Sequence, residues 1–168
     1  HSEHYRFIME YAQDIIYRTD RSGRFTFINP AVVRFLGYHE TDVLGHRALD
    51  FVHPNYRRST EHFYIRQFLR KTPSTYYEFP LVTRTHQTLW VGQNVQLLLR
   101  DQEVTGFQAV MRDISARKET EEALRFSQDR YRALFESSPE MLLTVDAKGT
   151  LLTVNATAAA ELGYSAEW

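Results

Sequence analysis

The feature that most constrains this chain is an internal repeat. Residues 5–38 align without a gap on residues 131–164, and many of the pairs that differ are apolar in both copies. Identical pairs include Tyr5 with Tyr131, Asp20 with Asp146, Gly23 with Gly149, Asn29 with Asn155 and Gly37 with Gly163. Self-similarity at a fixed period indicates repeated structural units, and this period is about the length of a small domain. The sequence therefore predicts one complete domain, a connector and the beginning of a second copy.

The repeat sets the expected domain boundaries. We expect a complete domain over residues 1–113, a linker helix over residues 114–137 and the start of a second domain over residues 138–168. The first unit is long enough to bury a core of its own. An isolated hairpin is marginal in water, so we expect the second copy to be ordered by packing on another chain or on the first domain. The chain is therefore interpreted as part of a longer protein.

Charge and cysteine content exclude several functions. Lys and Arg number 20 against 21 Asp and Glu, and no basic stripe is visible, so nucleic acid is not an expected partner. The absence of cysteine excludes disulfides, thiolate zinc sites and cysteine nucleophiles, and it fits a reducing, cytoplasmic location. No window approaches about eighteen apolar residues, although the parent protein can still be anchored in a membrane. Phosphate loops, serine elbows and zinc-protease motifs are missing, so we predict that this part of the chain is not an enzyme.

Periodicity predicts an α+β fold. An amphipathic helix is expected over residues 4–12, and a hairpin over residues 14–20 and 24–29 turns at Gly23. Helical segments are expected at residues 31–36, 40–44, 47–52 and 54–71. Three strands joined by short turns follow at residues 75–84, 88–100 and 103–113. These elements predict a five-stranded antiparallel sheet with helices on one face.

The linker helix carries a weak heptad pattern. Residues recurring at alternating intervals of four and three are Thr120, Leu124, Ser127, Tyr131 and Leu134. A solvated spacer helix and a dimeric coiled coil both remain open, because the seam is short and contains hydroxyl residues. A homodimer is the main partner prediction.

A series of short motifs resembles a PAS domain with its C-terminal PAC segment, as found in multi-PAS bacterial signalling proteins. The motifs are Asp20-x-x-Gly23, Asn29-Pro30-Ala31, Leu36-Gly37-Tyr38, Val43-Leu44-Gly45, His53-Pro54 and Asp113-Ile114-Ser115, and the series restarts at Tyr131. The resemblance implies a sensory input module that senses a small ligand or a redox or gas cue in an apolar pocket. It also implies that Asp113, Ile114 and Ser115 relay the signal through the helix to an effector, a histidine kinase or a cyclic-dinucleotide enzyme outside this sequence. A ligand-free scaffold that only sets dimer geometry is the alternative.

PAS domains hold ligands between sheet and helices, and strand alternation nominates the residues that would face such a pocket. The candidates are Tyr17, Phe27, Leu81, Val91, Phe107, Ala109 and Met111. They suit a small apolar ligand or haem, and an ordinary core without ligand is the default interpretation. Leu81, Val91 and Met111 also replace the polar groups that hold flavin in the light-sensing LOV branch. Ala48 stands where that branch has its reactive cysteine, so a LOV-type flavin is rejected.

The remaining candidates are histidines and structural residues. His62 lies where haem-binding relatives place a histidine, and it is the low-ranked haem-ligand candidate. His39, His46 and His53 are spaced by seven, but glycine and proline interrupt any helix that would align them, so no metal site is expected. Asn29 and Gly37 are interpreted as structural, at a strand-to-helix bend and at a helix end.

Overall fold

The computed structural model describes Glu3, Arg6, Ile8 and residues 13–163. The α+β prediction is confirmed, whereas the helix expected over residues 4–12 falls mostly outside the described residues. The first part of the chain contains β1 (Ile15–Asp20), β2 (Phe25–Ile28), α2 (Ala31–Leu36), α3 (Glu40–Val43), the 3-10 helices η1 (Ala48–Phe51) and η2 (Pro54–Tyr56), and α4 (Arg57–Arg70). The second part contains β3 (Ser74–Val82), β4 (Thr88–Arg100), β5 (Glu103–Asp113), α5 (Ser115–Ser137), β6 (Leu143–Val145), β7 (Leu151–Val154) and α6 (Ala156–Leu162).

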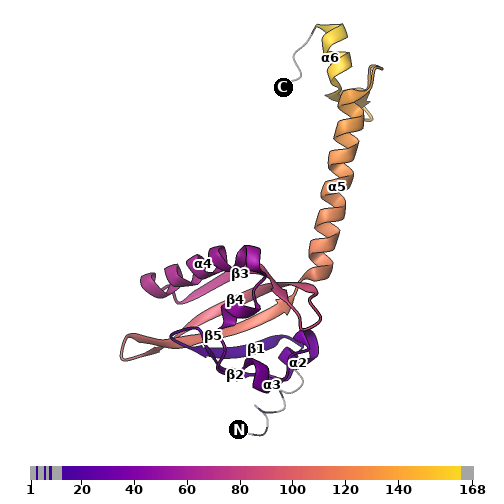
Figure 1. The fold of residues 1–168 in the computed structure, drawn as a ribbon. Coiled ribbons are helices and arrows are strands. Elements are labelled where there is room, and N and C mark those ends of the chain that lie inside the picture. The colour runs from indigo at the N-terminus through magenta and orange to yellow at the C-terminus, as the bar shows by residue number, and fades with distance from the viewer. Residues whose placement is uncertain (1–2, 4–5, 7, 9–12, 164–168) are drawn as a thin grey trace. The chain divides into compact units, whose positions relative to one another are not determined.

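The first five strands form one antiparallel sheet in the order β2-β1-β5-β4-β3 (Figure 1). The short turns between β3, β4 and β5 make neighbours of strands that follow each other in sequence. β1 returns to the sheet beside β5, so the hairpin and the three-stranded meander meet in the middle. Among the described residues, the helices that cover the inner face come from the segment between β2 and β3.

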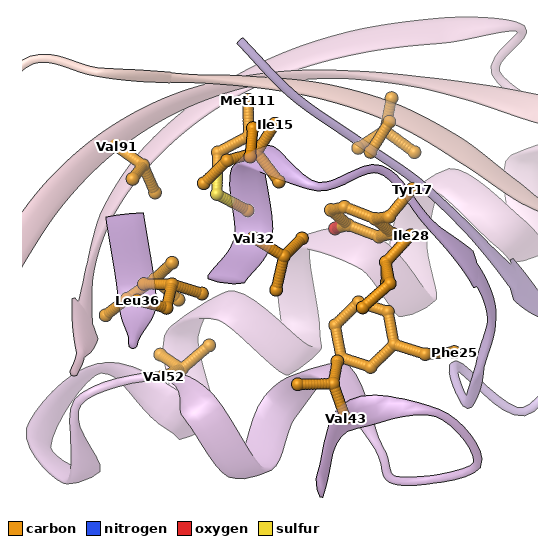
Figure 2. Packing of buried hydrophobic residues seen from close by; sticks show 14 of the residues in the cluster. Ile15, Tyr17, Phe25, Ile28, Val32, Leu36, Val43, Val52, Val91 and Met111 are labelled. Carbon is orange, nitrogen blue, oxygen red and sulfur yellow. The ribbon is translucent and has the colours of Figure 1, made fainter. Parts of the chain in front are cut away.

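The core lies between this inner face and α2 (Figure 2). Odd-numbered residues of β1, β3, β4 and β5 point inward, as strand alternation predicts, and Val91 and Met111 pack with Val32 and Leu36 of α2. The α2 helix ends at Gly37, whose φ of 76° is in the left-handed region and whose N–H donates to the carbonyl of Val33.

The alternation fails in β2, and the prediction for Phe27 is wrong in this respect. The pairing of β1 with β2 shifts between Arg18 and Thr19, so that Arg18 faces Phe27 and Thr19 faces Phe25. This bulge places an extra residue in β2. Phe25 and Ile28 are consequently buried, whereas the Phe27 side chain is 38% exposed and points away from the core.

The internal repeat reflects a repeated hydrogen-bonding pattern. Asn29 Oδ1 accepts from the N–H of Ile16 at 3.0 Å, and its Nδ2 donates to the carbonyl of Asp14 at 3.0 Å. Asn155 makes the matching pair of bonds in the second copy, from the Leu142 N–H at 3.1 Å and to the Glu140 carbonyl at 2.8 Å. Each buried amide therefore fastens the start of a strand to the bend that follows the hairpin.

Contacts divide the chain into two compact units, residues 1–118 and residues 119–168. The second unit contains the two-stranded β6–β7 sheet and α6. Its hairpin leaves Leu143, Leu151 and Leu152 exposed. Within the described residues, no helix combines the length and apolar character needed to cross a membrane.

Candidate ligand-binding cavity

A cavity of about 250 Å³ lies between the inner face of the sheet and α4. The sheet contributes Tyr17, Thr19, Phe79, Gln93, Val95 and Phe107 to its wall. The α4 helix contributes Thr60, Glu61, Tyr64, Ile65 and Phe68. The β1–β2 turn and η1 contribute the rest of the wall, and the cavity is partly open to solvent. Most of this surface is hydrocarbon, so the cavity favours an apolar occupant.

A buried chain of hydrogen bonds crosses one side of the cavity. The Tyr17 hydroxyl donates to Gln93 Oε1 at 2.6 Å, and Gln93 Nε2 donates to the Tyr64 hydroxyl at 2.7 Å. Burial raises the pKa of both phenols above the ordinary value, so both stay protonated and neutral at physiological pH. The amide and the phenols satisfy one another without introducing charge.

Thr60 supplies a second polar group to the wall. The residue is 1% exposed, and its hydroxyl has no hydrogen-bond partner in the described part of the chain. A buried hydroxyl without a partner costs about 1–3 kcal/mol. Its oxygen has almost no accessible surface, so this cost is not relieved by solvent in the cavity.

Charged residues near the cavity lie toward solvent. Arg47 Nη2 and Glu61 Oε1 are 3.4 Å apart, and their side chains are 46% and 42% exposed. Arg21 also borders the cavity and is exposed. The lining residues of the sheet carry no formal charge at neutral pH, so charge is confined to the rim.

The structure brings two of the predicted pocket residues to the cavity, namely Tyr17 and Phe107. The other predicted inward residues of β3, β4 and β5, which are Leu81, Val91, Ala109 and Met111, are buried in the core but do not line the cavity. The end of the sheet that holds Val91 and Met111 is filled by α2 side chains. The cavity consequently lies one or two inward-facing positions away from that end, at Phe79 on β3 and at Gln93 and Val95 on β4.

Neither cofactor geometry considered from the sequence fits this cavity. His62 is exposed on α4 and does not line the wall, which contradicts its proposed place as a haem ligand there. Ala48 does line the cavity, and its methyl group offers no thiol for a flavin adduct. The described residues hold no cluster of three potential metal ligands.

The start of α5 is tied to the sheet by backbone and side-chain bonds. Asp113 Oδ1 accepts from the Ser115 N–H at 2.9 Å, and the Ile114 N–H donates to the Trp90 carbonyl at 2.9 Å. The Ser115 hydroxyl accepts from the Trp90 N–H at 3.0 Å. The predicted relay residues therefore join the end of β5 to the neighbouring strand β4.

Glu78 on β3 forms ion pairs with Arg117 and Lys118 that the sequence did not reveal. This charged cluster, called the strap below, ties the start of α5 to β3. The Glu78 carboxylate accepts a hydrogen bond from Arg117 and lies 3.4 Å from Lys118 Nζ, which sits 4.9 Å above the Trp90 ring. The Tyr76 hydroxyl also donates to Glu78, at 2.9 Å. Burial alone would raise the pKa of the Glu78 carboxyl, but the Tyr76 hydrogen bond and the charges of Lys118 and Arg117 together hold it below its ordinary value.

Replacing Glu78 by glutamine should loosen this strap. We expect Glu78→Gln to lower the free energy of unfolding by about 1 kcal/mol and to speed amide exchange at residues 115–118. A carboxyl with a lowered pKa stabilises the fold above its ordinary pKa and loses that contribution as the pH falls through the lower folded value. The difference in unfolding free energy between the wild type and the variant should therefore shrink as the pH falls below about 4.5. Glu103→Gln, at an exposed position, is the control; identical exchange and acid behaviour in both variants would contradict the strap.

A five-stranded antiparallel sheet of this order, with helices on one face and a cavity between the sheet and α4, defines the class of α+β domains to which the chain belongs. A family model described as the PAS fold matches residues 3–114, and a model described as PAS domain matches residues 129–167. The chain belongs to the PAS family. PAS domains are sensor domains, so its role is signal input.

Known proteins agree with this assignment. The chain is 27% identical to sporulation kinase C of Bacillus subtilis over 124 residues, which is 73% of this chain and 28% of the kinase. The chain thus spans little more than a quarter of that relative. Two solved structures have a TM-score of 0.63: a PAS domain from Colwellia psychrerythraea (16% identity, 68% of this chain, 98% of the other) and a sensory box histidine kinase/response regulator from Burkholderia thailandensis (20%, 77% and 98%). A PAS-containing N-terminal domain of a diguanylate cyclase from Marinobacter aquaeolei scores 0.57 (18%, 62% and 98%).

Proposed function

We propose that the chain is a sensory input module in which a small molecule in the cavity changes how α5 is held at the edge of the sheet. One observation carries this proposal. Phe79 and Glu78 are consecutive on β3, and Phe79 lines the cavity on one face while Glu78 holds Arg117 and Lys118 on the other. A ligand that displaces Phe79 would also shift Glu78, the preceding residue on β3, and with it the ion pairs to Arg117 and Lys118.

The helix would pass this change to an effector domain of the same polypeptide. A histidine kinase or a cyclic-dinucleotide enzyme is the proposed effector, since a sporulation kinase, a sensory box histidine kinase and a diguanylate cyclase are among the similar proteins. The lack of cysteine supports a cytoplasmic location for this module.

The test is to ask what the cavity holds and whether α5 responds. We expect mass spectrometry of the denatured protein to detect a released small molecule, and we expect its removal to change amide exchange at residues 115–118. Ala48→Phe, which places a ring in the cavity, should prevent retention of the molecule without unfolding the domain. An empty protein whose α5 exchange never responds to added compounds would instead support the ligand-free scaffold.

We also propose that the module is a homodimer joined through α5. The helix has no buried residues, and Leu124, Tyr131 and Leu134 are each more than half exposed. These residues lie on the predicted heptad seam, and burying them against a second copy would remove apolar area from water.

Polar substitutions on this seam should weaken the dimer. We expect Leu124→Ser combined with Leu134→Ser to raise the dimer dissociation constant at least about tenfold, because each buried leucine contributes about 1.5–3 kcal/mol. Sedimentation equilibrium measures the effect, with Asp129→Ser on the opposite helix face as the control. A wild-type protein that is monomeric at high micromolar concentration would rule this dimer out.

A further inference from the structure

The hydrogen bonds that cross the cavity wall run in one direction. The Tyr17 hydroxyl donates to Gln93 Oε1 at 2.6 Å, and Gln93 Nε2 donates to the oxygen of the Tyr64 hydroxyl at 2.7 Å. All three side chains line the cavity. Burial raises the pKa of both phenols, so each keeps its proton at physiological pH. The direction of the chain therefore decides which of the two phenol protons has an acceptor.

Tyr17 sets this direction because it is the more buried of the two phenols. The residue is 6% exposed, and among the described residues its proton has no acceptor besides Gln93 Oε1. Turning the amide by 180° would exchange its oxygen for its nitrogen and point a donor at Tyr17. The buried phenol proton would then lose its partner, which costs about 1–3 kcal/mol. The stable arrangement therefore keeps Gln93 Oε1 on Tyr17 and Gln93 Nε2 on Tyr64.

The proton of the Tyr64 hydroxyl is the one left over. Its oxygen accepts from Gln93 Nε2, and no residue in the described ranges accepts the proton. Tyr64 lies on α4, is more exposed than Tyr17 and faces a cavity that is partly open to solvent. Water can therefore accept this proton when no ligand is bound. A ligand that displaces the water must present an acceptor of its own or leave the Tyr64 proton unpaired.

We infer that the Tyr64 hydroxyl donates a hydrogen bond to the bound molecule and selects ligands that carry an acceptor, such as a carbonyl oxygen. A hydrocarbon, or a molecule whose only polar group is an N–H donor, leaves the Tyr64 proton unpaired and is rejected. This inference rests on the proposed sensory function and specifies the polar group that its ligand must carry. Tyr17 is a positioning residue, because it holds the Gln93 oxygen away from Tyr64 without contacting the acceptor itself.

Two probes of the same shape test the inference on the whole chain. Acetophenone carries a carbonyl oxygen where α-methylstyrene carries a CH₂ group. Chemical-shift titration at Val95 and Phe107, on the cavity wall, gives a dissociation constant for each probe. The quantity compared between variants is the ratio of the two constants, because the difference in hydration between the probes is the same for every variant.

Tyr64→Phe removes the donor. We expect it to reduce the affinity for acetophenone relative to α-methylstyrene by about threefold to tenfold, the value of one neutral hydrogen bond. Retained binding of α-methylstyrene shows that the cavity is intact in the variant. Tyr38→Phe is the matched control, since the Tyr38 hydroxyl donates to the Val82 carbonyl outside the cavity, and its ratio should equal that of the wild type. A wild-type ratio in Tyr64→Phe would overturn the inference.

Tyr17→Phe tests the direction of the chain. Without the Tyr17 proton, the Gln93 amide can turn and accept from Tyr64, which then has a partner within the protein. We expect the ratio to move toward that of Tyr64→Phe by at least about threefold, although Tyr64 itself is unchanged. A loss of packing alone would weaken both probes and leave the ratio where it was. That outcome would overturn the positioning role of Tyr17.

Failure of the proposed function has a different signature. If neither probe shifts the cavity resonances of the wild type, the cavity does not take up small molecules, and both proposals fail. If both probes bind with a ratio that Tyr64→Phe does not change, only the inference about the acceptor fails. Binding that survives in Ala48→Phe would place the probes elsewhere and would likewise overturn the inference about this cavity.

Discussion

Replacing Gly106 by alanine is expected to lower the free energy of unfolding of the first unit by about 3 kcal/mol. Gly106 lies on β5 beside β1, and an added Cβ would overlap the backbone carbonyl oxygen of Thr19. Backbone atoms in the middle of a sheet cannot move aside without breaking ladder hydrogen bonds, so the overlap is relieved only by separating the strands. Hydrogen exchange of the β1 and β5 amides measures the loss.

Gly92 offers a matched comparison on the next strand. A Cβ at Gly92 would meet the phenol end of the exposed Tyr76 side chain, which can rotate away. Gly92→Ala should therefore cost less than about 1 kcal/mol. Equal losses in the two variants would show that side-chain space, and not the approach of two backbones, limits both positions.

Replacing Asn29 by alanine should lower the free energy of unfolding by a similar amount. Asn29→Ala leaves the Ile16 N–H and the Asp14 carbonyl without their partner, and the side chain is buried. Two unsatisfied groups at about 1–3 kcal/mol each predict a loss of about 3 kcal/mol, once access of water to the Asp14 side is allowed for. Hydrogen exchange of the protected β1 amides is again the measurement.

Two further variants separate the hydrogen bonds from the loss of volume. Asn29→Asp keeps an acceptor for the Ile16 N–H. Above the pKa of the new carboxyl it has no donor for the Asp14 carbonyl, whereas the protonated carboxyl has one, so its loss should be smaller below that pKa than above it. Asn94→Ala truncates an exposed amide on β4 and should be nearly neutral. If Asn29→Ala lowered the free energy of unfolding as little as Asn94→Ala, the two Asn29 side-chain hydrogen bonds would contribute little to the fold.

The elements of the fold were largely predictable because their signals are local. The helix at residues 31–36 and the strand at residues 88–100 have the predicted bounds, since glycine, proline and alternation mark both. The bulge opposite Thr19 was not predictable, because it depends on the register between two strands. Its consequence is the outward position of Phe27, which strict alternation had placed inside.

The site was predictable only in part, because its position depends on packing between distant segments. Alternation identified the inward face and hence Tyr17 and Phe107, but it could not show that α2 fills the end of the sheet near Val91. Gln93 could have been predicted, because a glutamine at an inward-facing position between Val91 and Val95 indicates a polar group inside the domain. Nothing local distinguished Glu78, whose role arises from partners nearly forty residues away.

The repeat of the Asn29 hydrogen-bonding pattern at Asn155 has a consequence for folding during synthesis. β1 and β6 belong to equivalent hairpins, so both are candidates to pair with β5. A chain made from its N-terminus completes β5 before β6 emerges, and only the correct hairpin is then available. During refolding from denaturant both hairpins are present at once. The same chain should therefore fold more faithfully on the ribosome than in the test tube, where exchange of hairpins between copies competes with the native sheet.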